Sequence, residues 1–191
     1  MRRFASWTSY KPAAAAAPPA AAACIRVLGL DPGSRITGYG LIESTASGTR
    51  YVASGAIRAS AGEFTRRLAE IYAGVGALIA EHAPHEVAIE RVFVHRNADS
   101  ALKLGQARGA AICAAFGHGA QLFEYSPREV KLGIVGTGAA DKAQVQKMVS
   151  ALLGLDGPLG ADAADALALA LCHLHGRTLR RALGAAADGA A

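Results

Sequence analysis

The chain has 191 residues, of which 52% are hydrophobic and 18% charged, which excludes an intrinsically disordered protein and leaves enough chain to bury a core. No run of about 18 residues is rich enough in large apolar side chains to span a bilayer, so we expect no membrane segment. The net charge of +5 does not by itself indicate nucleic-acid binding, because residues 1–24 contribute +3 and residues 176–191 contribute +2, which leaves residues 25–175 neutral.

The composition divides the chain into three parts. Residues 13–23 contain only Ala and Pro, and the paired prolines break any helix that Ala favours, so residues 1–24 are predicted to be a disordered extension. Residues 25–178 carry the periodic apolar patterns of a folded domain. Residues 179–191 are rich in Ala and Gly and are predicted to form a flexible C-terminal tail.

Within the folded part, the apolar periodicity predicts alternating strands and helices. The strands are expected at residues 26–31, 39–43, 51–57, 86–92 and 121–125. The helices are expected at residues 64–79 and 98–116, from near 126, from near 141, and at 161–175. This order predicts an α/β fold with a mixed sheet.

Two acids stand where a buried strand ends. Asp31 closes the run Arg-Val-Leu-Gly-Leu-Asp, and Glu90 alternates with Val87 and Ile89 on the predicted strand that contains it. A charge at the end of a buried strand is costly unless it is paired or bound to a metal. If the two strands are neighbours, the two carboxylates lie about 5 Å apart and repel each other, a conflict that a divalent cation removes.

A second pair of acids, Asp162 and Asp165, stands three residues apart at the start of the last helix and therefore shares one helix face. Taken alone, the pair is better explained by helix capping, because acids at a helix start accept from free N–H groups and suit the helix dipole. The surrounding alanines favour a functional role, since small neighbours let this helix start press closely onto another surface.

Four such carboxylates match the needs of a two-metal phosphodiester hydrolase. Oxygen ligands favour Mg²⁺ or Mn²⁺ over zinc. The three cysteines have neither the even count nor the close spacing of a disulfide or zinc framework, which predicts a reduced, intracellular protein. The histidines form no cluster, and His173 and His175 are predicted to be surface residues on different faces of the last helix.

Four stretches of the chain are diagnostic, namely Leu28-Gly-Leu-Asp-Pro-Gly-Ser-Arg-Ile-Thr-Gly-Tyr-Gly, Ala88-Ile-Glu-Arg-Val-Phe, Asn97-Ala-Asp-Ser-Ala-Leu-Lys-Leu-Gly-Gln-Ala-Arg-Gly and Ala161-Asp-Ala-Ala-Asp-Ala-Leu-Ala. Through these stretches, residues 26–175 resemble the RuvC family of bacterial Holliday-junction resolvases, which belongs to the ribonuclease H-like superfamily. The stretches cover nearly all of the folded region in the family's order, and the third is very specific to the family.

The resemblance implies a five-stranded mixed β-sheet flanked by α-helices, a homodimer, and catalytic, metal-binding acids at Asp31, Glu90, Asp162 and Asp165. It implies two Mg²⁺ ions per subunit, with Mn²⁺ able to substitute. The implied substrate is four-way junction DNA, cut by paired nicks in strands of like polarity to leave 5′-phosphate and 3′-hydroxyl ends. The implied partner is the RuvA–RuvB branch-migration complex, and the implied location is the bacterial cytoplasm.

Five further residues are candidates for DNA contact. Phe93 follows Glu90, and the resemblance places an aromatic there at the junction, where it would stack on a base. Lys131 and Lys142 match basic positions that the family uses near DNA, and Arg35 and Arg96 are loop cations close to acids that would contact phosphates. Each cation taken alone is more often a solvated surface charge.

Two observations extend the interpretation beyond the site itself. The Ala-rich stretch from Ala98 to Ala115 permits close helix approach and is a candidate dimer surface, with ordinary packing on the sheet as the alternative. With the four acids offset by bound cations, the folded region has a surplus of +4 to meet phosphates.

Two other classes of protein share part of this pattern. The sugar-kinase and actin superfamily also carries Asp-x-Gly after its first strand, but it needs two such domains, and about 150 folded residues supply one. A non-catalytic junction-binding protein is expected to have lost at least one acid, whereas all four are present here.

Overall fold

Five strands form one mixed sheet in a computed structural model that describes residues 24–91 and 97–188, with side chains described as far as Arg177. The strands are β1 (Cys24–Asp31), β2 (Ile36–Thr45), β3 (Gly48–Arg58), β4 (Glu86–Glu90) and β5 (Gln121–Tyr125). They lie in the order β3-β2-β1-β4-β5. The pairs β3–β2 and β2–β1 are antiparallel, whereas β1–β4 and β4–β5 are parallel, which confirms the predicted five-stranded mixed sheet.

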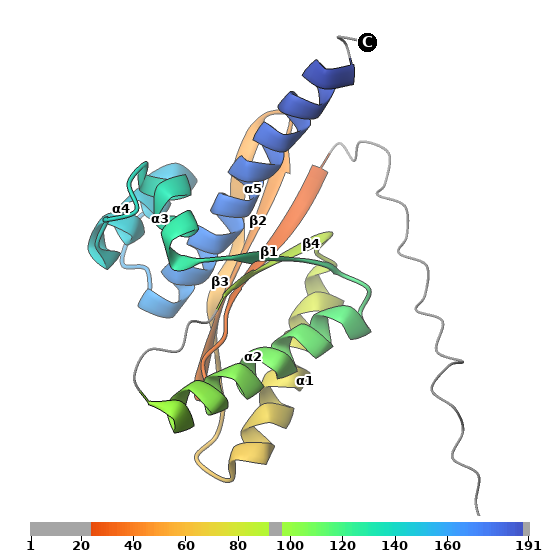
Figure 1. The fold of residues 1–191 in the computed structure, drawn as a ribbon, viewed down its shortest axis with the longest axis vertical. Helices are drawn as coiled ribbons and strands as arrows, with labels where there is room; N and C mark the ends of the chain where they lie inside the picture. The colour runs from red at the N-terminus through yellow and green to blue at the C-terminus, as the bar shows by residue number, and fades with distance from the viewer. Residues whose placement is uncertain (1–23, 92–96, 189–191) are drawn as a thin grey trace, which may run out of the picture.

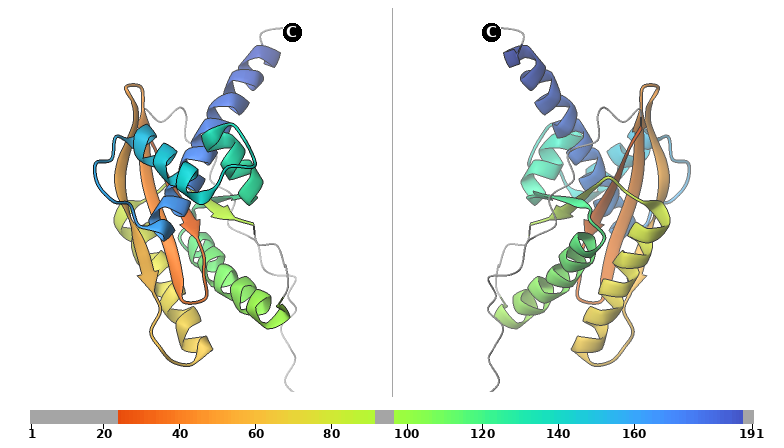
Figure 2. Two further views of the ribbon diagram at one scale, coloured as in Figure 1. Left: turned by 90° about the vertical axis from the view of Figure 1, so that its left-hand side faces the viewer. Right: turned by 90° about the vertical axis from the view of Figure 1, so that its right-hand side faces the viewer.

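Two layers of helices cover the sheet (Figures 1 and 2). The helices are α1 (Phe64–His82), α2 (Ala98–Gly117), α3 (Pro127–Val135), α4 (Lys142–Leu153) and α5 (Ala161–Asp188). Helices α1 and α2 bury Ile71, Val75, Ala107 and Ala111 against one face of the sheet. Helix α5 lies along the other face with α3 and α4 beside it. The strands alternate between these layers, as their sequence pattern predicts.

The predicted elements are present, with differences at their ends. β1 begins at Cys24, so this residue, assigned from composition to the N-terminal extension, is part of the sheet. Helix α5 continues past the predicted end at His175 to Asp188, because the Ala-rich sequence after His175 has a high helix propensity. The rest of the N-terminal extension and residues 189–191 lie outside the described residues.

Helix α5 approaches the sheet closely because glycines on β1 and β2 face it. A Cβ atom on Gly29 would lie 1.9 Å from the carbonyl oxygen of Ala166, and one on Gly38 would lie 2.2 Å from that of Asp162. A Cβ on Gly40 would lie 2.6 Å from the backbone nitrogen of Leu167. The prediction that the helix start presses onto another surface is confirmed, and the small residues lie on both partners.

The prediction that His173 is a surface residue is wrong. Its side chain is fully buried, its Nδ1 lies 2.7 Å from the Tyr125 hydroxyl, and its Nε2 lies 2.5 Å from a carboxylate oxygen of Glu86. The ring also packs on Phe123, with the two centroids 4.5 Å apart. His173 shares the sheet-facing side of α5 with Ala166 and Ala170, whereas His175 is exposed, as predicted.

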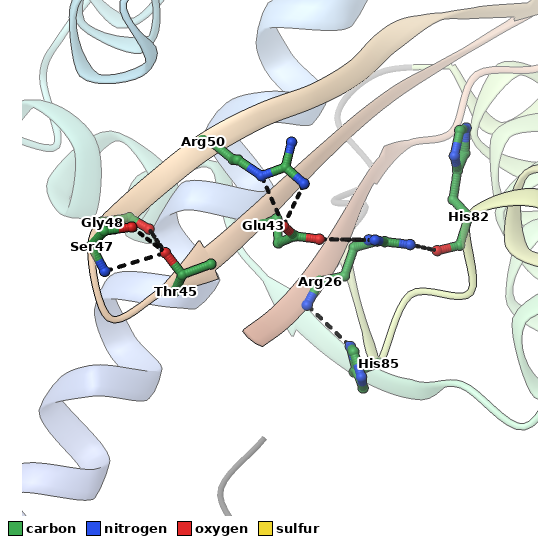
Figure 3. A network of polar contacts seen from close by, with 8 residues as sticks. All are labelled: Arg26, Glu43, Thr45, Ser47, Gly48, Arg50, His82 and His85. Atoms are coloured by element: carbon green, nitrogen blue, oxygen red, sulfur yellow. Dashed lines mark hydrogen bonds and ion pairs between the residues drawn. The ribbon is translucent and has the colours of Figure 1, made fainter. Parts of the chain in front are cut away.

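At the end of the sheet where β1 begins, a buried carboxylate is enclosed by cations (Figure 3). Glu43 on β2 is 6% exposed and accepts from Arg26 Nη2 at 2.8 Å and from Arg50 Nε at 2.8 Å. Arg26 also donates through Nη1 to the backbone carbonyl of His82 at the end of α1. The hydrogen bonds from the two arginines hold the pKa of Glu43 at about 2.

Within the described part of the chain, none of the helices combines the length and apolarity that a membrane crossing requires.

Candidate active site

The parallel pairing of β1 with β4 brings Asp31 and Glu90 together. Leu30 pairs with Ile89 in the register, so Asp31 and Glu90 are the next residues along two neighbouring strands, at the carboxyl end of each. Both acids alternate with residues that face α1 and α2, so both point to the side of the sheet that α5 covers. The expectation that the two strands are neighbours is confirmed.

The first turn of α5 brings the second pair of acids to the same place. Asp165 lines the same cavity as Asp31 and Glu90. The charge of Asp162 raises the pKa of Asp31, and the backbone of Asp162 lies against Gly38 of β2. The glycines of β1 and β2 set this position, because any larger residue at Gly38 would push the helix start away. The structure therefore gathers the four predicted acids at one edge of the sheet.

A cavity of about 320 Å³ opens at this edge. Its charged lining consists of three acids and two lysines, namely Asp31, Glu90, Asp165, Lys131 and Lys142. The apolar part of the lining includes Val130 of α3, Val145 of α4 and Leu169 of α5.

The two lysines are placed by capped helices. Helix α3 begins with a capping box between Ser126 and Glu129, and α4 begins with one between Asp141 and Gln144. These starts fix Lys131 and Lys142 on the cavity wall, and Lys142 Nζ donates to Asp165 Oδ2 at 3.0 Å. The Lys142 side chain is 83% exposed, so it can turn from Asp165 to another anion at little cost.

Burial and mutual repulsion perturb the central acids. Desolvation raises the pKa of Asp31 to about 6, with further increases from the charges of Asp165 and Asp162, against a lowering by Lys142. Desolvation and the charge of Asp31 raise the pKa of Glu90 to about 7. The two carboxyls also act on each other, because the charge of each one disfavours ionisation of the other.

The chemistry of these residues fits a divalent cation of the Mg²⁺ type. All four predicted ligands offer hard carboxylate oxygens, and the raised pKa values of Asp31 and Glu90 show that their negative charge is incompletely compensated by the protein. As the side chains stand in the described residues, no three His, Cys, Asp or Glu groups converge closely enough to share one ion. A bound cation therefore requires both Asp31 and Glu90 to be ionised and Asp165 to turn from Lys142.

The predicted DNA-contacting residues have different outcomes. Lys131 and Lys142 lie on the cavity wall beside the acids. Arg35 is exposed in the turn between β1 and β2 and does not line the cavity. Phe93 and Arg96 lie outside the described residues.

One residue close to the site was missed by sequence reasoning. Arg108 of α2 donates through Nε to the backbone carbonyl of Glu90 at 2.8 Å. An arginine beside Ala107, on the buried side of an Ala-rich helix, is a weak signal of such a contact, since a cation near a core needs a partner.

A mixed five-stranded sheet with acids at the ends of its two central parallel strands and at the start of the crossing helix defines a nuclease of the ribonuclease H-like class. The family model described as "Crossover junction endodeoxyribonuclease RuvC" matches residues 27–173. The chain therefore belongs to the RuvC family of crossover junction endodeoxyribonucleases.

Sequence relatives support this assignment over nearly the whole domain. The RuvC of Chromohalobacter salexigens is 59% identical over 151 residues, which cover 79% of this chain and 81% of the relative. The RuvC of Methylococcus capsulatus is 57% identical over 157 residues, which cover 82% of this chain and 94% of the relative.

Solved structures support the fold independently. Thermus thermophilus RuvC in complex with a Holliday junction substrate matches with a TM-score of 0.76 and 34% identity, over 81% of this chain and 96% of that chain. A yeast mitochondrial Holliday junction resolvase matches with a TM-score of 0.58 and 12% identity, over 79% of each chain, which supports the fold alone.

Proposed function

We propose that this protein cuts four-way DNA junctions by paired nicks in strands of like polarity, in recombination and DNA repair. The observation that carries this proposal is the cavity that three acids and two lysines from five different elements line together. The T. thermophilus relative bound to a Holliday junction identifies the kind of substrate.

We propose that Asp31, Glu90, Asp162 and Asp165 hold two Mg²⁺ ions per subunit, with Mn²⁺ able to substitute. When bound, these cations would neutralise the carboxylates, lower the pKa of the attacking water and stabilise the leaving oxygen. The reaction adds water to the scissile phosphorus and breaks its bond to the 3′ oxygen, which leaves a 5′-phosphate and a 3′-hydroxyl.

The lysines supply the charge that meets the DNA backbone. Lys142 is bonded to Asp165 in the free protein and is highly exposed, so it can exchange this carboxylate for a phosphate. Lys131, on the adjacent wall, would hold the same strand. Arg35, Phe93 and Arg96 remain proposals for contacts farther along the junction, with Phe93 stacking on a base.

The outer face of α2 is the proposed homodimer surface. Leu102 and Phe116 are each 62% exposed on it, and glycines at 105 and 109 leave open space between them. A two-fold dimer would present two identical cavities to a substrate with approximate two-fold symmetry, which accounts for paired nicks. Replacing Leu102 with Asp is expected to give monomers that nick junctions without pairing the cuts, whereas an unchanged mass in light scattering would exclude this surface.

From its family, we also propose that the protein works with the RuvA–RuvB complex and that it is located in the bacterial cytoplasm.

The decisive experiment uses a synthetic four-way junction with each strand end-labelled in turn. We expect symmetric nicks in two opposed strands with Mg²⁺, no cleavage with EDTA, and no cleavage of linear duplex DNA. Binding without cleavage in every divalent metal would instead identify a non-catalytic junction-binding protein.

A further inference from the structure

Arg108 holds the peptide unit that joins Glu90 to Arg91. Its Nε donates to the Glu90 carbonyl oxygen at 2.8 Å. The N–H of the same peptide unit, that of Arg91, donates to the Tyr125 carbonyl oxygen at 2.7 Å. The Glu90–Arg91 peptide is therefore held at both of its polar ends, where β4 leaves the sheet.

The guanidinium of Arg108 is oriented by this contact. Its Nη2 lies 2.8 Å from Glu124 Oε1 but is buried and lacks the alignment of a hydrogen bond, so the aligned contact is the one to Glu90. Glu124 balances the charge of Arg108, whose side chain is only 18% exposed. A planar guanidinium with one aligned bond and one ion pair has little freedom to turn.

We propose, on the basis of the function proposed above, that Arg108 is a positioning residue for cleavage, which holds the Glu90–Arg91 peptide so that the Glu90 carboxylate stays in place to share a cation with Asp31. A peptide plane fixed at both ends fixes the direction in which the Glu90 side chain leaves the backbone. Groups that orient metal ligands in this way typically change metal affinity or activity by roughly 10–100-fold when they are removed.

The same fold offers a matched control. Arg26 also joins a backbone carbonyl, that of His82, to a carboxylate on a neighbouring strand, that of Glu43. Its position where β1 begins is at the opposite end of the sheet from Asp31 and Glu90. Removal of Arg26 therefore shows the effect of losing a structural arginine that has no contact with the acids of the cavity.

The test compares Arg108→Ala, Arg108→Lys and Arg26→Ala in two measurements. The first is Mn²⁺ binding to the DNA-free protein by electron paramagnetic resonance. The second is the Mg²⁺ dependence of single-turnover junction cleavage. We expect Arg108→Ala to weaken Mn²⁺ binding and to raise the Mg²⁺ concentration for half-maximal cleavage, each by roughly 10–100-fold.

Two further variants sharpen the expected result. Arg108→Lys should recover part of the loss, because an ammonium can still donate to the Glu90 carbonyl. Arg26→Ala should lower the melting temperature and leave both metal curves unchanged.

The proposal is overturned if Arg108→Ala binds Mn²⁺ like the wild type, if it lowers cleavage by one factor at every Mg²⁺ concentration, or if Arg26→Ala shifts the curves equally. If Arg108→Ala does not fold, Arg108→Lys decides by the same criteria. A wild-type protein that binds Mn²⁺ but cuts no junction would end the proposed function, and the Mn²⁺ measurements would still decide the role of Arg108.

Discussion

Buried acids at the two ends of the sheet have their pKa values shifted in opposite directions. Where β1 begins, Glu43 is enclosed by Arg26 and Arg50, and their hydrogen bonds lower its pKa to about 2. Where β1 ends, burial and mutual repulsion raise the pKa of Asp31 to about 6 and that of Glu90 to about 7. At the first end the protein itself supplies the compensating cations, whereas at the second it leaves part of the charge for a ligand.

This contrast separates acids that stabilise the fold from acids that are available for function within one sheet. A compensated acid such as Glu43 stabilises the fold, because its partners are present in the folded state at all times. Asp31 and Glu90 destabilise the metal-free fold at neutral pH, which is typical of a site kept for binding or catalysis. Substitutions near Glu43 should therefore change mainly stability, whereas substitutions near Asp31 and Glu90 should change mainly cleavage.

The largest expected effect is on cleavage. Asp31→Asn keeps the size of the side chain but removes one proposed ligand, so junction cleavage should fall by roughly 10³-fold or more while junction binding is retained. Glu43→Gln should leave cleavage by the folded protein unchanged and lower its melting temperature. Single-turnover cleavage and gel-shift binding measure both, and normal cutting by Asp31→Asn would refute the metal role.

A slightly smaller loss of cleavage is expected when Gly38, which has no reactive group, is replaced. Gly38→Ala places a Cβ against the backbone of Asp162, so the start of α5 must move away from Asp31. A displacement of about 1 Å should lower cleavage by roughly 10²-fold. Gly62→Ala is the control, because a Cβ there meets open space, and equal activities of the two variants would show that the close approach is unimportant.

The next prediction concerns stability without metal. Because the folded-state pKa values of Asp31 and Glu90 lie above their ordinary values of 3.8 and 4.5, the folded protein holds protons more tightly than the unfolded chain. The stabilisation from these groups is full below about pH 4 and is lost as the pH rises through 6 and 7. Asp31→Asn should therefore unfold at a higher temperature than wild type at pH 8 in EDTA, by about 4 °C, which corresponds to about 1–2 kcal/mol.

Calorimetry in EDTA from pH 5 to pH 8 checks this prediction. Addition of Mg²⁺ at pH 8 should stabilise the wild type more than the variant. Parallel melting curves for the two proteins across this pH range would contradict the raised pKa values.

The smallest expected effect is on the free energy of unfolding, at the end of the sheet where β1 begins. The Arg50 side chain is 62% exposed, so Arg50→Ala should lower the free energy of unfolding by only about 0.5–1 kcal/mol and leave cleavage unchanged. Because Arg50 helps to hold the pKa of Glu43 at about 2, part of the wild-type advantage comes from ionised Glu43 and is lost as the pH falls from about 4.5 towards 2, so the difference between the two proteins should shrink at low pH; urea titrations at pH 7 and pH 3 measure both effects.

The candidate site could be predicted to a large extent because its signals are local. Asp31 and Glu90 each end a short apolar run, and the parallel pairing of two such runs is a general property of α/β sheets. Asp162 and Asp165 stand out against alanines at a helix start. Each signal needs only a few neighbouring residues to be visible.

The features that sequence reasoning missed depend on contacts between distant segments. The role of Arg108 follows from its reach across the end of β4 to Glu90, and no spacing along the chain reveals it. The burial of His173 follows from the position of α5 between the sheet and two other helices, where the polar partner Glu86 comes from another element. The close contact at Gly29 depends on which face of β1 meets α5.

The site joins the two ends of the folded chain, and this has a consequence for the timing of activity during synthesis. Asp31 lies on the first strand, whereas Asp162 and Asp165 lie on the last helix, which packs directly on β1 and β2. A nascent chain that has already formed the sheet still lacks half of the acids. The ribosome must therefore release almost the whole domain before the set of four is assembled, so an unfinished chain would lack half of the proposed metal ligands.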